Sequence, residues 1–160
     1  MGSFIRKMKF HPNSRIDTGE EMISSFYNNK EIGWKKVKKF ETVIYEYVID
    51  TIVIAYVTVS MGKIREKIDD KEYSYPAMLL GMMGVDIQYQ KQGIGPILID
   101  YVIGLANELK EQVGCRFIYL DVDRDSQQLI NYYERNGFEL ASVQSRKKTF
   151  TMYFDLFIEN

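Results

Sequence analysis

Cysteine and histidine are almost absent from this chain of 160 residues, which contains one of each, Cys115 and His11. A single cysteine excludes an internal disulfide, and one cysteine with one histidine cannot form a zinc cluster. Cys115 precedes the apolar run Phe117–Leu120 and is interpreted as a small buried side chain. We therefore expect neither a metal cofactor nor a cysteine nucleophile.

An excess of one charge is also lacking, because 21 lysine and arginine residues face 22 aspartate and glutamate residues, a formal net charge of -1. This balance gives no support to nucleic acid as a partner. Basic clusters occur at Lys35–Lys39 and Arg146–Lys148, and runs of this length are usually solvated faces. The sequence assigns them no function.

Long apolar runs are missing too. The longest strand-like one, Ile52–Val59, is far too short to cross a bilayer, and the start Met1–Phe4 lacks a signal-peptide core. The myristoylation pattern fails because Arg6 occupies its serine or threonine position. We expect no membrane partner and a cytoplasmic location.

What the chain does have is a hydrophobic fraction of 46%, enough to bury a sizeable core in one domain, taken as residues 3–160. Apolar alternation and helical spacing predict a mixed sheet with one strand-helix-strand unit. Strands are expected at 3–10, 41–49, 52–60, 77–86, 116–122, 139–143 and 149–157, and helices near 96–113 and 126–135. Two earlier helices are expected to carry Met22, Ile23, Phe26 and Tyr27, and Trp34, Val37 and Phe40. Thr18-x-x-Glu21 is a candidate capping box, and the charged stretch 62–75 is expected to be a loop.

The segment Gln90–Gly95 lies between a predicted strand and a predicted helix. Its two glycines let backbone N–H groups converge beside a helix N-terminus, an arrangement that suits a pyrophosphate. The alternative is that these glycines only connect the strand to the helix and bind nothing. Leu98 stands where a dinucleotide fingerprint needs a third glycine. Pro96 and Ile97 stand where a nucleoside-triphosphate loop needs lysine and serine or threonine. Both familiar nucleotide loops are excluded.

A second motif, Tyr132-Tyr133-Glu134-Arg135-Asn136-Gly137-Phe138, follows about forty residues later. Together with Gln-x-x-Gly-x-Gly at Gln90–Gly95 and the predicted order of elements, it resembles the GNAT superfamily of N-acetyltransferases. The resemblance covers nearly the whole chain. It implies an α/β (α+β) fold in which a mixed, mostly antiparallel sheet of about seven strands splays at the fourth and fifth strands, flanked by about four helices.

The resemblance also implies acetyl-CoA as the donor cosubstrate. Its pyrophosphate would lie on the backbone of Gln90, Lys91, Gln92, Gly93, Ile94 and Gly95. The backbones of Met83, Gly84 and Val85 would line the pantetheine arm, and Asn131 would lie near the thiol end. Simple core packing is the alternative for the side chains of Met83 and Val85.

Tyr133 maps onto the general acid of this superfamily, and a phenol can protonate a departing thiolate. The alternative is a packed aromatic residue with an idle hydroxyl, and Tyr132 is expected to be its packing partner. No general base is assigned, because Gly81, Met82 and Met83 occupy the expected carboxylate sites. Removal of the amine proton through a water relay is then the remaining option. Asp121 and Asp123 are further candidates that could equally be solvated or capping groups.

The acceptor is expected to be a primary amine of a small molecule or peptide. The segments Tyr75–Gly81 and Val113–Phe117 resemble the branch of aminoacyl-tRNA-acetylating toxins, but Met82 replaces an arginine usual there. Transfer RNA is therefore the minority hypothesis, beside a non-catalytic acyl-CoA-binding or regulatory module. A homodimer through an exposed final strand is a further option.

Overall fold

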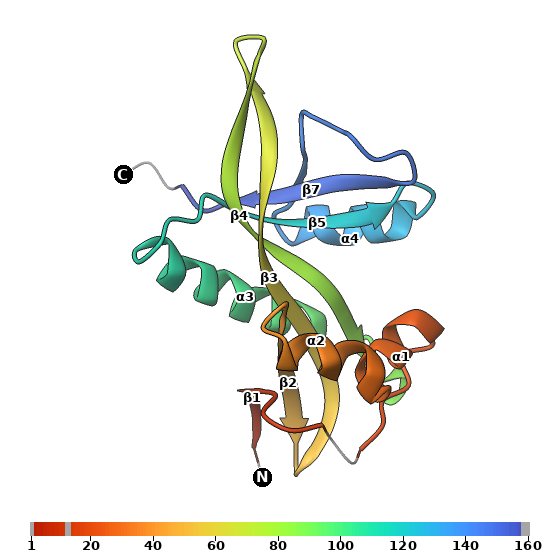
Figure 1. Cartoon of the computed structure of the whole chain (residues 1–160). Coiled ribbons are helices and arrows are strands. Elements are labelled where there is room, and N and C mark those ends of the chain that lie inside the picture. Colours follow the sequence, from red (N-terminus) through yellow and green to blue (C-terminus); the bar gives the residue numbers. More distant parts are fainter. Residues whose placement is uncertain (1, 12–13, 158–160) are drawn as a thin grey trace. The chain divides into compact units, whose positions relative to one another are not determined.

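The computed structural model describes residues 2–11 and 14–157. Its seven strands are hydrogen-bonded in the order β1-β2-β3-β4-β5-β7-β6, and Figure 1 shows the elements along the chain. Contacts divide the chain into two compact units, which are described one at a time. The first runs to Ser60 and includes Gly81–Asp100, and the second comprises Met61–Leu80 and the residues from Tyr101 onward.

The first unit contains an antiparallel meander formed by β1 (Ser3–Lys7), β2 (Val43–Ile49) and the start of β3 (Ile52–Ile68). The β2–β3 hairpin turns at Asp50 and Thr51, as the sequence predicts, and both have left-handed φ angles of 47° and 72°. Positive φ at both central residues is what a type I′ turn requires. The turn therefore pairs the two apolar strands, and β3 is buried on both faces from Val53 to Val59.

Three helical segments precede β2: α1 (Glu21–Asn28), a π-helical turn (Lys30–Trp34) and α2 (Lys35–Lys38). Helix α1 corresponds to the first helix expected there, and the π-helical turn and α2 together correspond to the second. The predicted capping box is wrong, because α1 begins after Glu20 and has no side-chain cap. Thr18 instead bonds through its hydroxyl to Ser24 Oγ at 2.9 Å and to the Glu20 N–H at 3.2 Å. Its side chain closes the turn before the helix rather than capping it.

The interior of the first unit gathers buried side chains from these helices and strands, namely Met8, Ile16, Phe26, Tyr27, Ile44, Val48, Val53 and Tyr56. One charged group is buried among them, the carboxylate of Glu46, which is 3% exposed. Tyr27 Oη donates to one oxygen of Glu46 at 2.5 Å and Arg6 Nε to the other at 3.0 Å. The buried charge is thus fully paired.

The expectation of a loop at 62–75 is wrong. Strand β3 continues to Ile68 and β4 (Lys71–Val85) begins three residues later, so this stretch is the tip of a long hairpin (Figure 1). Asp69 and Asp70 make the turn with φ of 51° and 66°. Buried and exposed side chains alternate even in this charged stretch, because Ile64 is 4% exposed while Lys63 and Arg65 face solvent. One buried face is enough to hold a strand that composition alone suggests is a loop.

The second unit is built on β5 (Phe117–Asp123), which pairs in parallel with Ala77–Leu79 of β4 and antiparallel along its whole length with β7 (Thr149–Asp155). Helix α3 (Ile94–Lys110) leads into β5, and α4 (Gln127–Arg135) follows it. The parallel pairing, the mixed sheet and the four α-helices in the described part of the chain confirm the expected α/β fold.

The final strand is not the exposed edge that was expected. Strand β6 (Glu139–Leu140) pairs with β7 at Tyr153 and Met152, and the side chain of Gln144 bonds both backbone groups of Thr151. The edge strand of the described sheet on this side is the two-residue β6. Pairing through β7 in a dimer would have to displace these contacts.

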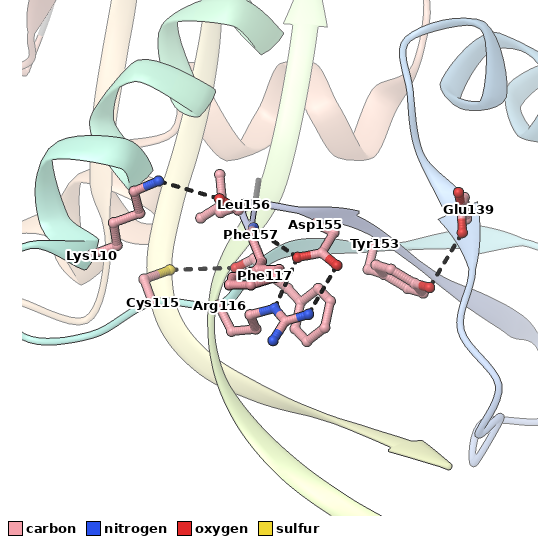
Figure 2. Close-up of polar contacts among 9 residues, drawn as sticks. All are labelled: Lys110, Cys115, Arg116, Phe117, Glu139, Tyr153, Asp155, Leu156 and Phe157. Carbon is pink, nitrogen blue, oxygen red and sulfur yellow. Dashed lines mark hydrogen bonds and ion pairs between the residues drawn. The ribbon is translucent and has the colours of Figure 1, made fainter. Parts of the chain in front are cut away.

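The end of β7 is tied to the start of β5 by an ion pair. Figure 2 shows Arg116 facing Asp155, with Nε and Nη2 at 2.9 and 3.1 Å from the two carboxylate oxygens. The guanidinium also lies 4.8 Å from the Phe157 ring centroid. Burial raises the pKa of the Asp155 carboxyl, but the hydrogen bonds from Arg116 and the Phe157 N–H and the charge of Arg116 together exceed this effect, so the pKa is lowered.

Within the described residues, no helix is long and apolar enough to cross a membrane.

Candidate functional site

The last residues of β4, in the first unit, are those that the sequence predicts to line the pantetheine arm. Gly84 is buried, and a Cβ added there would lie 2.6 Å from Ile23 Cγ2 and 2.7 Å from Thr18 Cγ2. The backbone at Gly84 therefore lies directly against the start of α1, and no larger residue fits without a shift. Nearby, the Met82 N–H of β4 donates to the side-chain hydroxyl of Thr58 on β3 at 2.8 Å.

The loop after β4 has the open geometry that a phosphate cradle needs. A 3₁₀ turn (Ile87–Tyr89) leads into Lys91 and Gly93, whose φ angles are 63° and 81°. A Cβ added at Gly93 would meet no atom within 4 Å, so space lies over its backbone. Helix α3 begins at Ile94, two residues before the expected Pro96, so its first turn already includes Gly95. The first N–H groups of this helix are available to an anion.

Gln90 joins the loop to the strand. Its side-chain amide donates to the Val85 carbonyl at 2.9 Å and to the Thr18 carbonyl at 2.8 Å. Asp86 adds a second brace, because its carboxylate accepts from the Asp17 N–H at 3.1 Å and from the Gln88 N–H at 3.0 Å. The structure thus brings Met83, Gly84 and Val85 together with Gln90–Gly95 in one continuous strand-to-loop segment.

Two other expected residues, Asn131 and Tyr133, lie on α4 in the second unit. The Tyr133 ring is half-buried and is held edge-on by the Tyr132 ring, with centroids 5.2 Å apart, and by the Phe138 ring at 5.7 Å. Phe138 in turn packs on Phe154 of β7 at 5.8 Å. Gly137, with φ of 92°, ends the helix so that the chain can place Phe138 there.

The hydroxyl of Tyr133 has no hydrogen-bond partner anywhere in the described part of the chain. Burial, with a smaller contribution from Tyr132, raises the pKa of Tyr133 from 10.0 to about 12. The phenol is therefore protonated at every physiological pH and has a proton to donate. Asn131 is exposed, and its carbonyl oxygen accepts a hydrogen bond from Gln127 at 2.8 Å.

The two candidate bases on β5 are already engaged. Asp121 Oδ1 accepts from the Thr151 hydroxyl at 2.8 Å, and its Oδ2 lies 3.6 Å from Arg146 Nε. Asp123 Oδ1 accepts from the Asp125 N–H at 3.0 Å, which closes the turn before α4. Asp123 therefore closes a turn before the helix and does not cap it, since α4 begins after Ser126 and has no side-chain cap. Within the described residues, no three histidine, cysteine, aspartate or glutamate side chains are grouped to hold a metal ion.

Tyr119 and Gly62 are features that sequence reasoning missed. A Cβ on Gly62 would lie 2.1 Å from the Tyr119 hydroxyl, so only glycine leaves room for this phenol. The backbone N–H of Lys63 faces the same hydroxyl. A glycine inside a charged stretch was the available signal, but the stretch was interpreted as a loop.

In comparison with known families, the model described as the acetyltransferase (GNAT) family matches residues 15–138. Curated protein sequences gave no match.

Several solved structures are similar. A tyrosine-to-phenylalanine mutant of the AtaT toxin, bound to the C-terminus of the antitoxin AtaR and acetyl-CoA, has 16% identity and a TM-score of 0.77, covering 98% of this chain and 94% of that one. AtaT complexed with acetyl-methionyl-tRNA has 16% identity and a TM-score of 0.78, covering 96% and 95%. The KacTA–DNA complex has 19% identity and a TM-score of 0.75, covering 97% and 94%. At these identities the likeness concerns the fold.

Proposed function

Since the chain belongs to the GNAT acetyltransferase family, we propose that it moves an acetyl group from acetyl-CoA to a primary amine, with Tyr133 as the general acid. The family match extends over both motifs, because residues 15–138 include Gln90–Gly95 and Tyr132–Phe138. We take residues 3–160 as the functional domain, of which 12, 13 and 158–160 lie outside the described residues.

The donor site is proposed along the segment from Met83 to Gly95. The left-handed residues Lys91 and Gly93 and the open space over Gly93 support a pyrophosphate cradle. The Val85 carbonyl already accepts one hydrogen bond from the Gln90 side chain, which braces the backbone at the end of β4. Pro96, in the first turn of α3, lacks an N–H, so the cradle relies on the backbone from Gln92 to Gly95.

Bound acetyl-CoA supplies an acetyl carbon activated as a thioester. In the proposed reaction the amine nitrogen forms a bond to this carbon, the carbon–sulfur bond breaks, and the sulfur leaves with the electron pair. Tyr133 donates its hydroxyl proton to the sulfur, and the amine releases one proton, which restores the phenol through solvent. No side chain is assigned as base, because Asp121 and Asp123 are engaged, so a water relay removes that proton.

One observation carries the role of Tyr133: a half-buried phenol, oriented by two aromatic rings, whose hydroxyl has no partner among the described residues. A fully buried tyrosine such as Tyr56, which is 0% exposed, usually finds a hydrogen-bond partner, and Tyr56 donates to the Ile23 carbonyl at 2.5 Å. The Tyr133 hydroxyl is not among the buried unpartnered polar atoms of the described residues, so it reaches solvent and is available to a ligand.

The test is release of free thiol from acetyl-CoA by the pure protein across a panel of primary amines. Amine-dependent release supports the proposal. Tight coenzyme A binding without release across the panel would favour the alternative of a non-catalytic acyl-CoA-binding module.

A second acceptor, the amino group of an aminoacyl-tRNA, is favoured by the likeness to AtaT, which was solved with acetyl-methionyl-tRNA. The chain's net charge of -1 argues against it. Expression in growing cells separates the two acceptors. Growth arrest that Tyr133→Phe relieves would indicate the tRNA substrate, and normal growth would indicate a small amine.

A further inference from the structure

Within the first unit, strand β4 contains one residue more than the stretch of β3 that lies beside it. A Cβ added to Gly81 would lie 2.6 Å from Thr58 Oγ1, so these two residues are neighbours across the strands. A Cβ added to Gly84 would lie 3.4 Å from the Tyr56 ring, which makes that pair neighbours as well. Two residue steps separate Thr58 from Tyr56 on β3, whereas three separate Gly81 from Gly84 on β4. An extra residue in one strand of an antiparallel pair is a β-bulge.

After the bulge the two strands stay in register. The Asp86 N–H donates to the Ile54 carbonyl at 2.8 Å. Asp86 follows Gly84 by two residues, and Ile54 precedes Tyr56 by two. The extra residue therefore lies between Gly81 and Gly84.

The hydroxyl of Thr58 holds this bulge in place. In a bulge two consecutive residues lie opposite one, and here Gly81 and Met82 lie opposite Thr58. The Met82 N–H donates to Thr58 Oγ1 at 2.8 Å, and Thr58 is 3% exposed. A buried N–H that loses its partner is costly, so the side chain of Thr58 supplies an acceptor that stabilises the bulge.

The bulge decides which backbone groups of β4 face away from β3. Successive residues of a strand direct their N–H and C=O groups alternately to its two edges. Asp86 faces β3, because its N–H bonds Ile54. Val85 and Met83 therefore face the opposite edge, and the Val85 carbonyl is indeed bonded there by the Gln90 side chain. Without the extra residue these directions would be reversed.

The opposite edge of β4 is open to a ligand at this point. The pairing of β4 with β5 covers only Ala77–Leu79, so the described sheet provides no strand partner for the later residues of β4 on that side. Backbone groups at such an edge can bind an extended ligand through the hydrogen bonds of a strand. The amide groups of a pantetheine arm can make these bonds.

We propose that Thr58 is a positioning residue for the acyl-CoA donor: its hydroxyl holds the bulge at Gly81–Met82 and so directs the backbones of Met83 and Val85 towards the pantetheine arm. Thr58 acts through β4 and needs no contact with the donor. This role rests on the proposed function, since it concerns the same donor site.

The test measures the dissociation constant of coenzyme A with the full chain by isothermal titration calorimetry. Thr58→Val keeps the shape of the side chain and removes the acceptor, so affinity should fall by about tenfold or more. Thr58→Ser keeps the hydroxyl and should stay within about threefold of the wild type.

Thr42→Val is the matched control. Thr42 is also a buried threonine of the first unit, and its hydroxyl donates to a β3 backbone group, the Val59 carbonyl, at 3.0 Å. This variant loses a buried hydrogen bond outside the bulge, so coenzyme A affinity should change by less than about twofold.

Gly81→Ala tests the same contact from the other strand. The added Cβ would lie 2.6 Å from Thr58 Oγ1 and must displace the hydroxyl. Coenzyme A binding should again weaken by about tenfold, and combining this change with Thr58→Val should add little further loss. In turnover, the KM for acetyl-CoA should rise with the loss of affinity while the KM for the amine stays within about twofold.

Equal coenzyme A affinity in the wild type, Thr58→Val and Gly81→Ala would overturn the role of Thr58 and leave the proposed function standing. An equally large loss in Thr42→Val would also overturn it, because general destabilisation would then explain the effect. Absence of coenzyme A binding by the wild type would contradict the donor site itself and defeat the proposed function.

Discussion

The side-chain amide of Gln90 donates a 2.9 Å hydrogen bond to the carbonyl oxygen of Val85 and so fastens the glycine loop to the strand that precedes it. Both residues are expected to bind the donor through their backbones, so this contact links two halves of one proposed site. The same amide reaches the Thr18 carbonyl, which connects the loop to the segment before α1.

Gln90→Ala removes both bonds and should raise the KM for acetyl-CoA by about tenfold, because a loosened loop must be ordered on binding. The measurement is steady-state kinetics with varied acetyl-CoA. Gln92→Ala is the control, since its side chain makes only a 3.3 Å contact to the Gln88 carbonyl. Equal KM values in the two variants would refute the bracing role of Gln90.

The pH dependence of turnover follows from the pKa of Tyr133, which burial raises to about 12. The acid form persists well past neutrality, so kcat should show no falling limb from this group below about pH 11. The folded protein holds the phenol neutral, so its contribution to the free energy of unfolding is lost as pH rises from about 10 towards 12. A pH–rate profile with a falling limb near neutrality that Tyr133→Phe abolishes would contradict this assignment.

Tyr27→Phe should lower the free energy of unfolding by about 1–3 kcal/mol, because Glu46 then keeps a buried charge with one donor fewer. Urea denaturation measures the change. Tyr47→Phe is a matched control: its hydroxyl bonds Ser3, which is exposed and can turn to water, so the loss should stay below about 1 kcal/mol. Equal losses in the two variants would show that the Glu46 charge gains nothing from Tyr27.

Thr51→Gly should stabilise the protein by about 1 kcal/mol, since a β-branched residue is strained at the φ of 72° found there. Thermal unfolding tests it. Thr51→Ala relieves less of the strain because it keeps a Cβ. A lower melting temperature for the glycine variant would show that the turn differs from a type I′ turn.

The sequence was most informative where apolar periodicity was uninterrupted. Strand β5, helix α4 and the left-handed Gly137 lie where the pattern predicts, because burial, helix spacing and C-terminal glycine chemistry agree there. The prediction failed at 62–75, where exposed charges concealed the alternation around Ile64. Charged residues indicate which face of a strand is exposed to solvent. Whether the opposite face is buried depends on the residues that pack against it.

The site could be predicted only in part. Backbone roles at Gln90–Gly95 follow from glycine spacing, whereas the side-chain bond from Gln90 to Val85 depends on tertiary distance. The role of Thr58 could not be predicted, since its hydroxyl reaches the Met82 N–H only across the paired strands.

The most direct test of the central claim measures thiol release from acetyl-CoA by the wild-type protein and Tyr133→Phe with the same amine. The account predicts amine-dependent release that falls by roughly ten- to a thousandfold in the variant, while coenzyme A affinity stays unchanged. Equal turnover in the two proteins would contradict the role of Tyr133, and absence of amine-dependent release would contradict the proposed activity itself.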